Sequence, residues 1–373
     1  MEPLKNNFSP ELVMCIAGHL SKHLTDFNKA GFETAILSEL DKLELKERIQ
    51  LIADNLHASL PHQHKVRNSI LLAMLHPEKN PAPDLQSNEQ GIHGWGVLPL
   101  CAVVGQHGTS SFEGSLEVLK QMTRHFSSEL DVRYFLLADQ KRALGIMAEW
   151  INHPSHHVRR LVSEGTRPRL PWAMQLPSLI ADPSPALPLL NALKDDKEEY
   201  VRRSVANHLN DISKDHPDLV VKLAKKWIKN ASENRKKLLR HGCRTLIKQG
   251  HSGALAIFGF AEPQIELSNF LIGTPAIEFG KNLNFSVRVQ STSKAKQSLV
   301  IDYVLHFKKS NGKLSPKVFK WKILILEPNQ DILLTRAHAI KPITTRKYYS
   351  GQHALSLRIN GRDYGLENFD LKC

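Results

Sequence analysis

The chain has 373 residues, which is long for a single hydrophobic core and predicts two or more domains. Its composition, 41% hydrophobic and 23% charged, is that of a soluble globular protein, and no apolar run approaches the roughly 18 residues of a membrane span. The formal net charge of +13 favours a polyanionic partner, with nucleic acid ahead of an anionic membrane surface.

The four cysteines, Cys15, Cys101, Cys243 and Cys373, lie far apart and show no metal-ligand spacing. This pattern argues against a zinc site and a disulfide framework, and it fits a reducing compartment. The N-terminal sequence lacks the basic and apolar regions of a signal peptide. We therefore expect a cytoplasmic protein.

The first 80 residues predict helices. Ser9 and Pro10 form a typical helix start, since Pro is favoured at the first helical position. A polar loop is expected over 77–90, and the Gly-containing apolar segment 91–108 is expected to pass through the core. Apolar residues recur at helical spacing in 12–20, 32–43, 45–56 and 66–75.

Between residues 111 and 250 the predicted helices come in pairs. The tripeptide Val-Arg-Arg opens a helix at Val158 and again at Val201, 43 residues later, and a second similarity links Arg203 to Arg240 at a spacing of 37. Such recurrence is typical of HEAT-type solenoids, in which each helix pair buries its apolar face against its neighbours. The predicted helices cover 115–126, 130–138, 140–151, 158–165, 187–193, 201–211, 219–229 and 236–248.

The second helices of these pairs are expected to line a concave wall that carries many arginines. Arginine forks suit DNA phosphates. The alternative is that one of Arg159 and Arg160 bonds instead to carbonyls or acids of a neighbouring helix. The arginines on this predicted wall are Arg159, Arg160, Arg202, Arg203, Arg240 and Arg244.

From about residue 262 the apolar residues alternate with a period of two, and Gly and Asn turns separate them. About seven short strands predict an immunoglobulin-like sandwich without the cysteine pair of antibody domains. Residues 262–373 hold 12 Lys and 5 Arg against 9 acids, so DNA contact is an open possibility. The predicted fold is thus an all-α HEAT-like α-solenoid (1–260) followed by a small all-β immunoglobulin-like sandwich (262–373).

Three residues stand out against this basic background. Trp172 follows Arg167 and Arg169 in a Pro-rich loop, where it is either a packing anchor or a surface for stacking on a base or cation. Asp211 either pairs with an arginine or lies in the basic groove, where its carboxylate would interact with positive charge on a substrate. Glu129 either caps a helix start or, like Asp211, is a carboxylate that interacts with positive charge on a substrate.

His153, His156 and His157 cluster around a proline, but no Cys or acid stands at ligand spacing, so we expect no metal there. The chain has no Gly-rich phosphate loop of the P-loop type and no Gly-x-Ser-x-Gly elbow. We expect no cofactor.

Three stretches carry a family resemblance: FSSELDVRYFL (126–136), HPSHHVRRLVSEGTRPRLPW (153–172) and YVRRSVANHLNDISKDHP (200–217). Together they resemble the AlkC branch of the AlkC/AlkD-like DNA alkylation-repair glycosylases, over most of residues 1–260. The basic sandwich is similar to the immunoglobulin-like domain of some AlkC proteins. AlkC members often have Phe-Ala-Ile-Arg-Pro where this chain has residues 130–134, Leu-Asp-Val-Arg-Tyr.

The resemblance implies a glycosylase that hydrolyses the N-glycosidic bond of cationic N-alkylated bases in duplex DNA, such as 3-methyladenine and 3-methylcytosine, without flipping the base. It implies that Glu129, Trp172 and Asp211 are the catalytic residues, and that Arg160 contacts the DNA backbone near the lesion. We expect further DNA contacts from Arg159, Arg169, Arg203 and Arg240. The expected state is a monomer, and the alternative function is a non-catalytic HEAT-repeat scaffold that binds DNA or an acidic protein.

Overall fold

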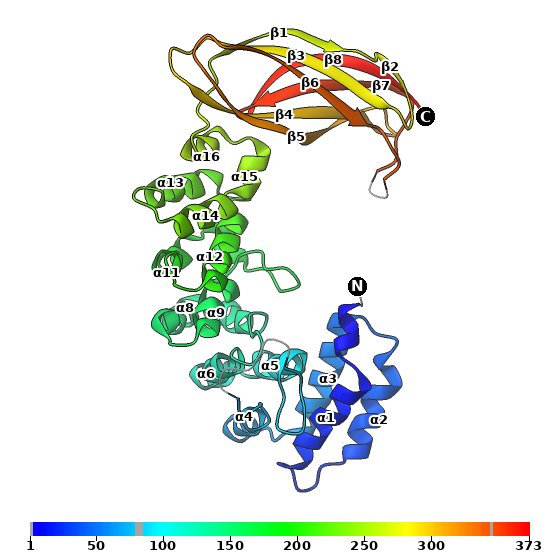
Figure 1. Cartoon of the computed structure of the whole chain (residues 1–373). Coiled ribbons are helices and arrows are strands. Elements are labelled where there is room, and N and C mark those ends of the chain that lie inside the picture. The colour runs from blue at the N-terminus through cyan, green and yellow to red at the C-terminus, as the bar shows by residue number, and fades with distance from the viewer. Residues whose placement is uncertain (1–2, 79–84, 344–345) are drawn as a thin grey trace. The chain divides into compact units, whose positions relative to one another are not determined.

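The structure, a computed structural model, describes residues 3–78, 85–343 and 346–373, with helices followed by strands along the chain (Figure 1). Short 3₁₀ helices cover Leu4–Asn7, Gly94–Gly96, Thr109–Ser111, Trp150–Asn152 and Ser184–Ala186. The α-helices are α1 (Pro10–Ser21), α2 (Lys29–Leu40), α3 (Leu45–Ser59), α4 (His64–Ala73), α5 (Val97–His107), α6 (Phe112–Met122), α7 (Val132–Ala138), α8 (Gln140–Glu149), α9 (His156–Gly165), α10 (Pro177–Ala181), α11 (Leu187–Leu193), α12 (Glu199–Ile212), α13 (Pro217–Trp227), α14 (Glu233–Gly242), α15 (Arg244–Gln249) and α16 (Ser252–Ile257).

The predicted helix start at Ser9 is confirmed. The Ser9 hydroxyl accepts a hydrogen bond from the Leu12 N–H at 3.4 Å, and Pro10 occupies the first helical position. The segment 91–108, predicted to cross the core, contains α5, whose residues from Val97 to Gly105 are all buried. Part of the predicted 77–90 loop, residues 79–84, lies outside the described residues.

The predicted single helix over 236–248 is wrong, because the chain forms two helices there. α14 ends at Gly242 and α15 begins at Arg244. A Cβ atom at Gly242 would approach the Leu209 side chain to 3.2 Å, so glycine permits close packing of α14 on α12. Glycine also weakens the helix interior, which accounts for the break at this point.

The chain forms two compact units. The first comprises residues 1–215 and 232–242, and the second comprises 216–231 and 243–373. The second unit therefore contains α13, α15 and α16 together with the strands. Within the first unit α9 packs against α12, and α12 packs against α14. This row of helices carries Arg159 and Arg160 on α9, Arg202 and Arg203 on α12, and Arg240 on α14.

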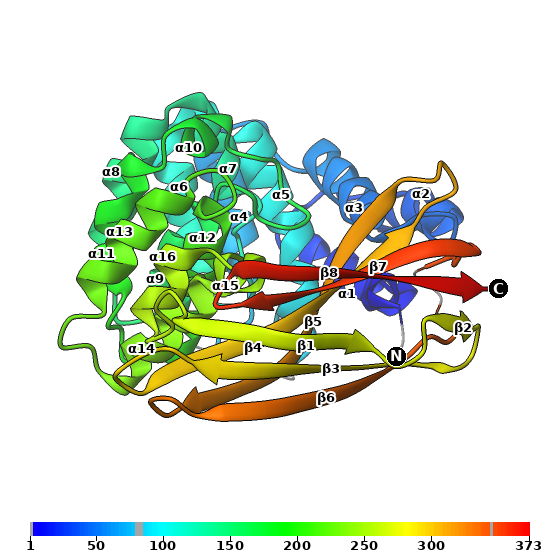
Figure 2. The ribbon, with the colours of Figure 1, turned by 90° about the horizontal axis from the view of Figure 1, so that it is seen from above.

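The strands form two sheets packed face to face (Figures 1 and 2). One has the order β1-β3-β6 and the other β2-β8-β7-β4-β5, with β2 parallel to β8 and the other pairs antiparallel. The strands are β1 (Ile265–Ile272), β2 (Ala276–Glu278), β3 (Asn282–Ser291), β4 (Gln297–Lys308), β5 (Leu314–Leu326), β6 (Asp331–Ala339), β7 (Gly351–Ile359) and β8 (Arg362–Lys372).

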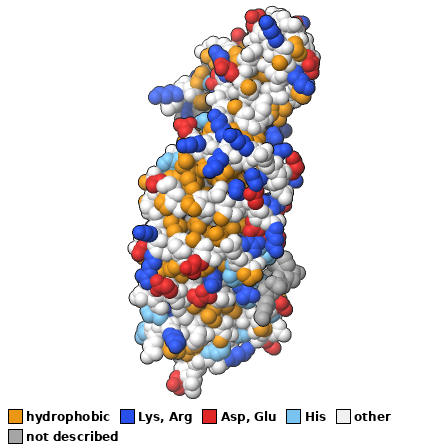
Figure 3. Space-filling model, turned by 90° about the vertical axis from the view of Figure 1, so that its left-hand side faces the viewer, with side chains coloured by type: hydrophobic (Ala, Val, Ile, Leu, Met, Phe, Trp, Pro, Cys, Tyr) orange, Lys and Arg blue, Asp and Glu red, His pale blue; other side chains and the backbone are white. Residues whose placement is uncertain are grey.

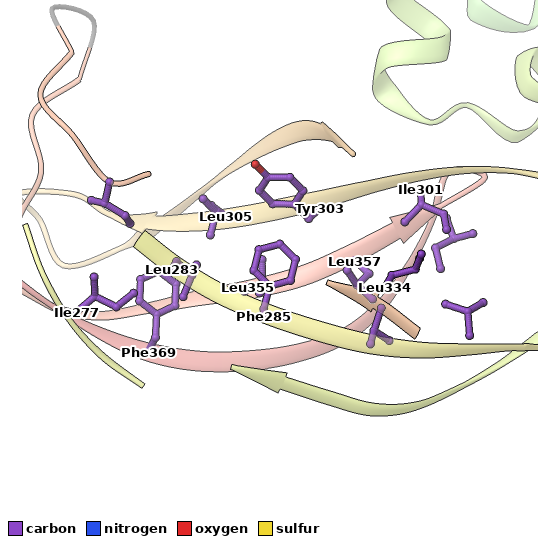
Figure 4. Packing of buried hydrophobic residues seen from close by; sticks show 14 of the residues in the cluster. Ile277, Leu283, Phe285, Ile301, Tyr303, Leu305, Leu334, Leu355, Leu357 and Phe369 are labelled. Carbon is purple, nitrogen blue, oxygen red and sulfur yellow. The ribbon is translucent and has the colours of Figure 1, made fainter. Parts of the chain in front are cut away.

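Alternate side chains of the two sheets meet in one apolar core. Phe285 of β3 and Leu334 of β6 pack in one cluster with Tyr303 of β4 and Leu355 of β7, as Figure 4 shows. The period-two pattern thus predicts the correct inward face, because successive strand residues point to opposite sides of a sheet. The sandwich predicted from the pattern is present.

A tight turn between β7 and β8 joins the sandwich to the helices of its own unit. Asn360 and Gly361 have φ angles of 44° and 84°, as a two-residue hairpin turn of the Asn-Gly type requires. The Asn360 side-chain amide donates to the carbonyl oxygens of Ala261 (2.7 Å) and Ser298 (3.0 Å). Gly361 lies directly against the backbone of Gly250, at the end of α15.

On the side of the molecule seen in Figure 3, Lys and Arg side chains are interspersed with Asp, Glu and hydrophobic side chains. That face is therefore not uniformly basic. Among the described residues, no helix has the length and apolar character needed to cross a membrane.

Candidate active site

A cavity of about 700 Å³ in the first unit brings together two of the three residues singled out from the sequence, Glu129 and Trp172. Both aliphatic and aromatic side chains line it, together with a small number of charged ones. Such a lining is typical of ligand sites. The lining residues are Leu45, Lys46, Ile49, His93, Trp95, Leu98, Arg124, His125, Phe126, Ser127, Glu129, Leu130, His156, His157, Arg160, Pro171, Trp172 and Tyr200.

Glu129 lies just before α7 and faces this cavity. The neighbouring Ser128 is buried, and its hydroxyl donates to the Leu119 carbonyl at 2.6 Å, which fixes the segment against α6. The Glu129 carboxylate accepts hydrogen bonds from the Ser127 hydroxyl and from Arg160 Nη1, the latter at 2.5 Å. Glu129 is therefore paired with Arg160 and is not the N-cap of α7, which is Asp131.

Arg160 projects from α9 into the same cavity. Its guanidinium lies 4.8 Å from the Tyr200 ring centroid, and Nη2 approaches a Glu164 oxygen at 3.6 Å. Burial opposes its charge, but the carboxylates of Glu129 and Glu164 outweigh burial and leave the Arg160 pKa raised. The side chain keeps 15% exposure, so its charge is accessible from the cavity.

Trp172 is presented in an unusual way. Its side chain is 57% exposed, and its φ angle of 67° lies in the left-handed region, where large side chains are rare. The loop that carries it closes through a hydrogen bond from the Leu176 N–H to the Pro168 carbonyl at 3.1 Å. Of the two alternatives left open by the sequence, exposure favours a surface for stacking over a packing anchor.

Asp211 lies on the buried face of α12 and does not line the cavity. Its side chain is 2% exposed. One carboxylate oxygen accepts from Arg167 Nε at 2.8 Å, and the other from Lys214 Nζ at 3.0 Å. Arginine pairing, one of the two alternatives for Asp211, is thus present.

A continuous chain of ion pairs links Asp211 to the cavity. Arg167 bonds both Asp211 and Glu164, the latter at 2.6 Å. Glu164 in turn faces Arg160, which bonds Glu129. Two of the three catalytic candidates therefore line the cavity, and the third, Asp211, is connected to it through Arg167 and Glu164.

The expected DNA-binding arginines divide into two groups. Arg159 is 7% exposed and is used within the fold: it forms a two-bond pair with Asp196 (2.6 and 3.0 Å) and donates to two backbone carbonyls. Arg159 therefore takes the other role that the sequence left open, a bond to an acid of a neighbouring helical segment, here Asp196 just before α12. Arg169, Arg203 and Arg240 are on the surface; Arg169 pairs with Asp215, and Arg203 pairs with Glu199.

Sequence reasoning missed most of the cavity lining. His156 and His157, for which the sequence predicted no role, begin α9 and lie near the Tyr200 ring. The spacing of four between His156 and Arg160 places both on one helix face, and this is the sequence signal that could have found them. Burial lowers the pKa of His125 and of His157 to about 4 and also lowers that of His93, so these rings are neutral at pH 7.

Because of the buried Asp131, two residues after Glu129, we expect the free energy of unfolding to depend on pH. Asp131 is 5% exposed, and burial followed by the charge of Glu129 raises its pKa to about 8. The folded pKa lies above the unfolded value of about 4, so the stabilising contribution is present below pH 4 and is lost as the pH rises to 8. We expect Asp131→Asn to stabilise the protein by at least about 2 kcal/mol at pH 9 and little at pH 4.

Urea unfolding of wild type and variant at the two pH values checks this. The exposed Asp41 provides the control, because Asp41→Asn removes a carboxylate whose side chain is 96% exposed. An equal effect of Asp131→Asn at pH 4 and pH 9 would contradict the prediction.

Among residues 3–78, 85–343 and 346–373, no group of three or more His, Cys, Asp or Glu side chains is arranged to hold a metal ion. The four cysteines are all free thiols.

Comparisons with known proteins cover the whole chain. The sequence model described as DNA alkylation repair enzyme matches residues 121–247, and that of the C-terminal Ig-like domain of the uncharacterised protein YhaZ matches 266–373. The uncharacterized protein YhaZ of Bacillus subtilis (strain 168) is 37% identical over 363 residues, 97% of each chain. The alkylpurine DNA glycosylase AlkC of Pseudomonas fluorescens, solved bound to DNA containing an abasic site analog, is similar over 100% of both chains, with 35% identity and a TM-score of 0.82.

Proposed function

The chain belongs to the AlkC branch of the AlkC/AlkD-like DNA alkylation-repair glycosylases, and we propose that it excises cationic N-alkylated bases from duplex DNA. The proposed substrates are lesions of the 3-methyladenine and 3-methylcytosine type. The observation that carries the proposal is the cavity that Glu129 and Trp172 both line, which a series of ion pairs connects to Asp211.

The proposed chemistry uses the charge of the lesion. When the bond between C1′ and the alkylated base breaks, its electron pair goes to the base and neutralises it, so the base leaves without a general acid. The sugar acquires oxocarbenium character, which the Asp211 carboxylate stabilises. Water then adds to C1′ and gives its proton to that carboxylate. No second carboxylate at glycosidase spacing is needed.

Asp211 must become accessible in this scheme. Arg167 holds one carboxylate oxygen from the protein interior, whereas Lys214, whose side chain is 43% exposed, holds the other. We propose that Lys214 moves aside when DNA binds and that the cationic sugar takes its place. Trp172 would then offer its ring to the sugar or base through a cation–π contact, with the base remaining unflipped.

The proposed duplex contacts come from both parts of the chain. Arg160, Arg169, Arg203 and Arg240 are the helical candidates, while Arg159 is left out because its guanidinium is occupied by Asp196 and two carbonyls. The helix pairs are proposed to be HEAT-like repeats. The sandwich, with 12 Lys and 5 Arg against 9 acids over 262–373, is proposed to add phosphate contacts.

A release assay tests the function. The full chain is incubated with methylated duplex DNA, and free 3-methyladenine is measured; release above the uncatalysed rate is expected. The alternative, a non-catalytic scaffold that binds DNA or an acidic protein, predicts binding of unmodified DNA or of the acidic protein with no release of base.

Two adjacent arginines provide a matched test of DNA contact. We expect Arg160→Gln to weaken duplex binding and to lower the slope of log K against log salt concentration by about 1, because one phosphate contact is lost. Arg159→Gln should leave that slope unchanged and destabilise the fold by about 3 kcal/mol, because the Asp196 carboxylate, whose side chain is 6% exposed, loses its ion-pair partner. Fluorescence anisotropy at several salt concentrations and urea unfolding measure the two effects. Equal salt slopes for the two variants would remove Arg160 from the interface.

A further inference from the structure

Arg133 on α7 is fully buried, yet all of its observed hydrogen bonds go to backbone carbonyls of another segment. Nε donates to the Met174 carbonyl at 2.6 Å. Nη1 donates to the carbonyls of Gly165 (2.9 Å) and Arg167 (2.8 Å). Five planar donors allow one guanidinium to bind several carbonyls at once. Arg133 thereby ties together two stretches of chain, one before and one after Trp172.

The loop that Arg133 closes is under strain. Trp172 has φ 67°, and for a residue other than glycine the left-handed region costs about 1–2 kcal/mol. Such a conformation persists only when the surroundings hold it. Three carbonyl bonds from one buried side chain, together with the Leu176–Pro168 backbone bond, provide that hold.

The same guanidinium is connected to the other catalytic candidates. Arg133 follows Glu129 by four residues in one short segment, so the element that brings Glu129 to the cavity also grips the Trp172 loop. The carbonyl of Arg167 is bonded by Arg133 while the Arg167 guanidinium bonds Asp211. Burying a charge in this place is costly: burial, followed by the charge of Arg167, lowers the Arg133 pKa to about 10.

We propose that Arg133 is a positioning residue of the catalytic site. It holds Trp172 in its strained, exposed conformation, and it fixes the position of that loop relative to Glu129 and to the Arg167–Asp211 pair. Arg133 does not line the cavity, so it acts through the loop and not on the substrate.

Arg48 provides a matched control. It is also buried (5% exposed) and donates to three carbonyls, those of Lys5, Phe8 and Leu43, but none of these belongs to the Trp172 loop. Arg133→Lys and Arg48→Lys therefore remove comparable buried guanidinium bonds. Variants are compared at temperatures equally far below their unfolding midpoints, so that general destabilisation cancels.

The first readout does not depend on activity. The Trp172 contribution to fluorescence is obtained by subtracting the spectrum of Trp172→Phe in each background, and its quenching by acrylamide is measured. Arg133→Lys is expected to change the quenching constant and emission maximum of Trp172, and Arg48→Lys is expected to leave both as in wild type. Identical Trp172 signals in wild type, Arg133→Lys and Arg48→Lys would overturn the proposal.

The second readout rests on the proposed function. Misplacement of a catalytic group by about 1 Å costs about 10²-fold in rate, so Arg133→Lys is expected to lower kcat for 3-methyladenine release by about 10- to 100-fold with little change in duplex affinity. Millimolar guanidinium is expected to restore part of the rate in Arg133→Ala and none in Arg48→Ala. A kcat loss shared equally by Arg133→Lys and Arg48→Lys, without rescue, would overturn the proposal. If wild type releases no base, the proposed function fails while the fluorescence result still decides the role of Arg133.

Discussion

Replacing Asp211 by Asn is expected to slow release of 3-methyladenine by about 10²- to 10³-fold, the loss typical of removing one preorganised electrostatic group from an active site. Asparagine keeps the shape of the side chain and one acceptor for Arg167. It loses the negative charge that, in the proposed mechanism, stabilises the developing cation on the sugar. Single-turnover release from methylated duplex DNA measures the effect, and affinity for unmodified duplex should not fall, because a negative charge has been removed.

Asp215→Asn is the matched control for this experiment. Asp215 also pairs with an arginine of the Trp172 loop, Arg169, at 2.7 and 2.8 Å, but its side chain is 26% exposed. An exposed pair of this kind contributes little to stability or catalysis. We expect Asp215→Asn to release base at close to the wild-type rate. If Asp211→Asn does the same, the catalytic role of Asp211 is wrong.

Replacing Gly361 by Ala is expected to cause the largest loss of stability among surface turn positions. The φ angle of 84° is strained for any residue with a Cβ atom, and that atom would lie 1.8 Å from the Gly250 carbonyl oxygen. The strain costs about 1–2 kcal/mol and overpacking about 1–3 kcal/mol more. A lower urea midpoint should therefore accompany loss of the contact between the β7–β8 turn and the end of α15.

A second substitution, Gly312→Ala, separates the cost of backbone strain from the cost of overpacking. Gly312 has a similar φ angle of 78° in the turn between β4 and β5, but no atom lies within 4 Å of the Cβ position. This variant should show the backbone strain alone. Equal destabilisation by the two substitutions would mean that the turn moves away from Gly250 without cost.

Most of the fold was predictable from sequence, because the two hydrophobic periods differ so clearly. The helical region and the immunoglobulin-like domain of strands are confirmed by the structure and the comparisons. The break at Gly242 was not predicted, because it depends on how closely α14 approaches Leu209. The small helix α10 was also missed, because five residues are too few to show a helical period.

The candidate site was predictable only in part. The membership of the AlkC branch, inferred from three motifs, is confirmed. The roles of Glu129, Trp172 and Asp211 remain predictions, although the first two line one cavity and ion pairs connect it to the third. The sequence did not reveal which of the two adjacent arginines pairs with which acidic residue. Arg159 and Arg160 are adjacent in sequence and point to different faces of α9, one toward Asp196 and one toward Glu129.

The histidines that line the cavity next to Trp172 affect its local charge, which the net charge of the whole chain does not describe. With the pKa values of His125 and His157 near 4, their rings contribute lone pairs and polarisable surfaces at neutral pH, not charge. The positive charge in the cavity at neutral pH therefore comes from Lys46, Arg124 and Arg160, and the last of these pairs with Glu129. If the cavity holds a cationic base as proposed, protonation of His125 and His157 below about pH 4 would add positive charge to it and weaken binding of that base.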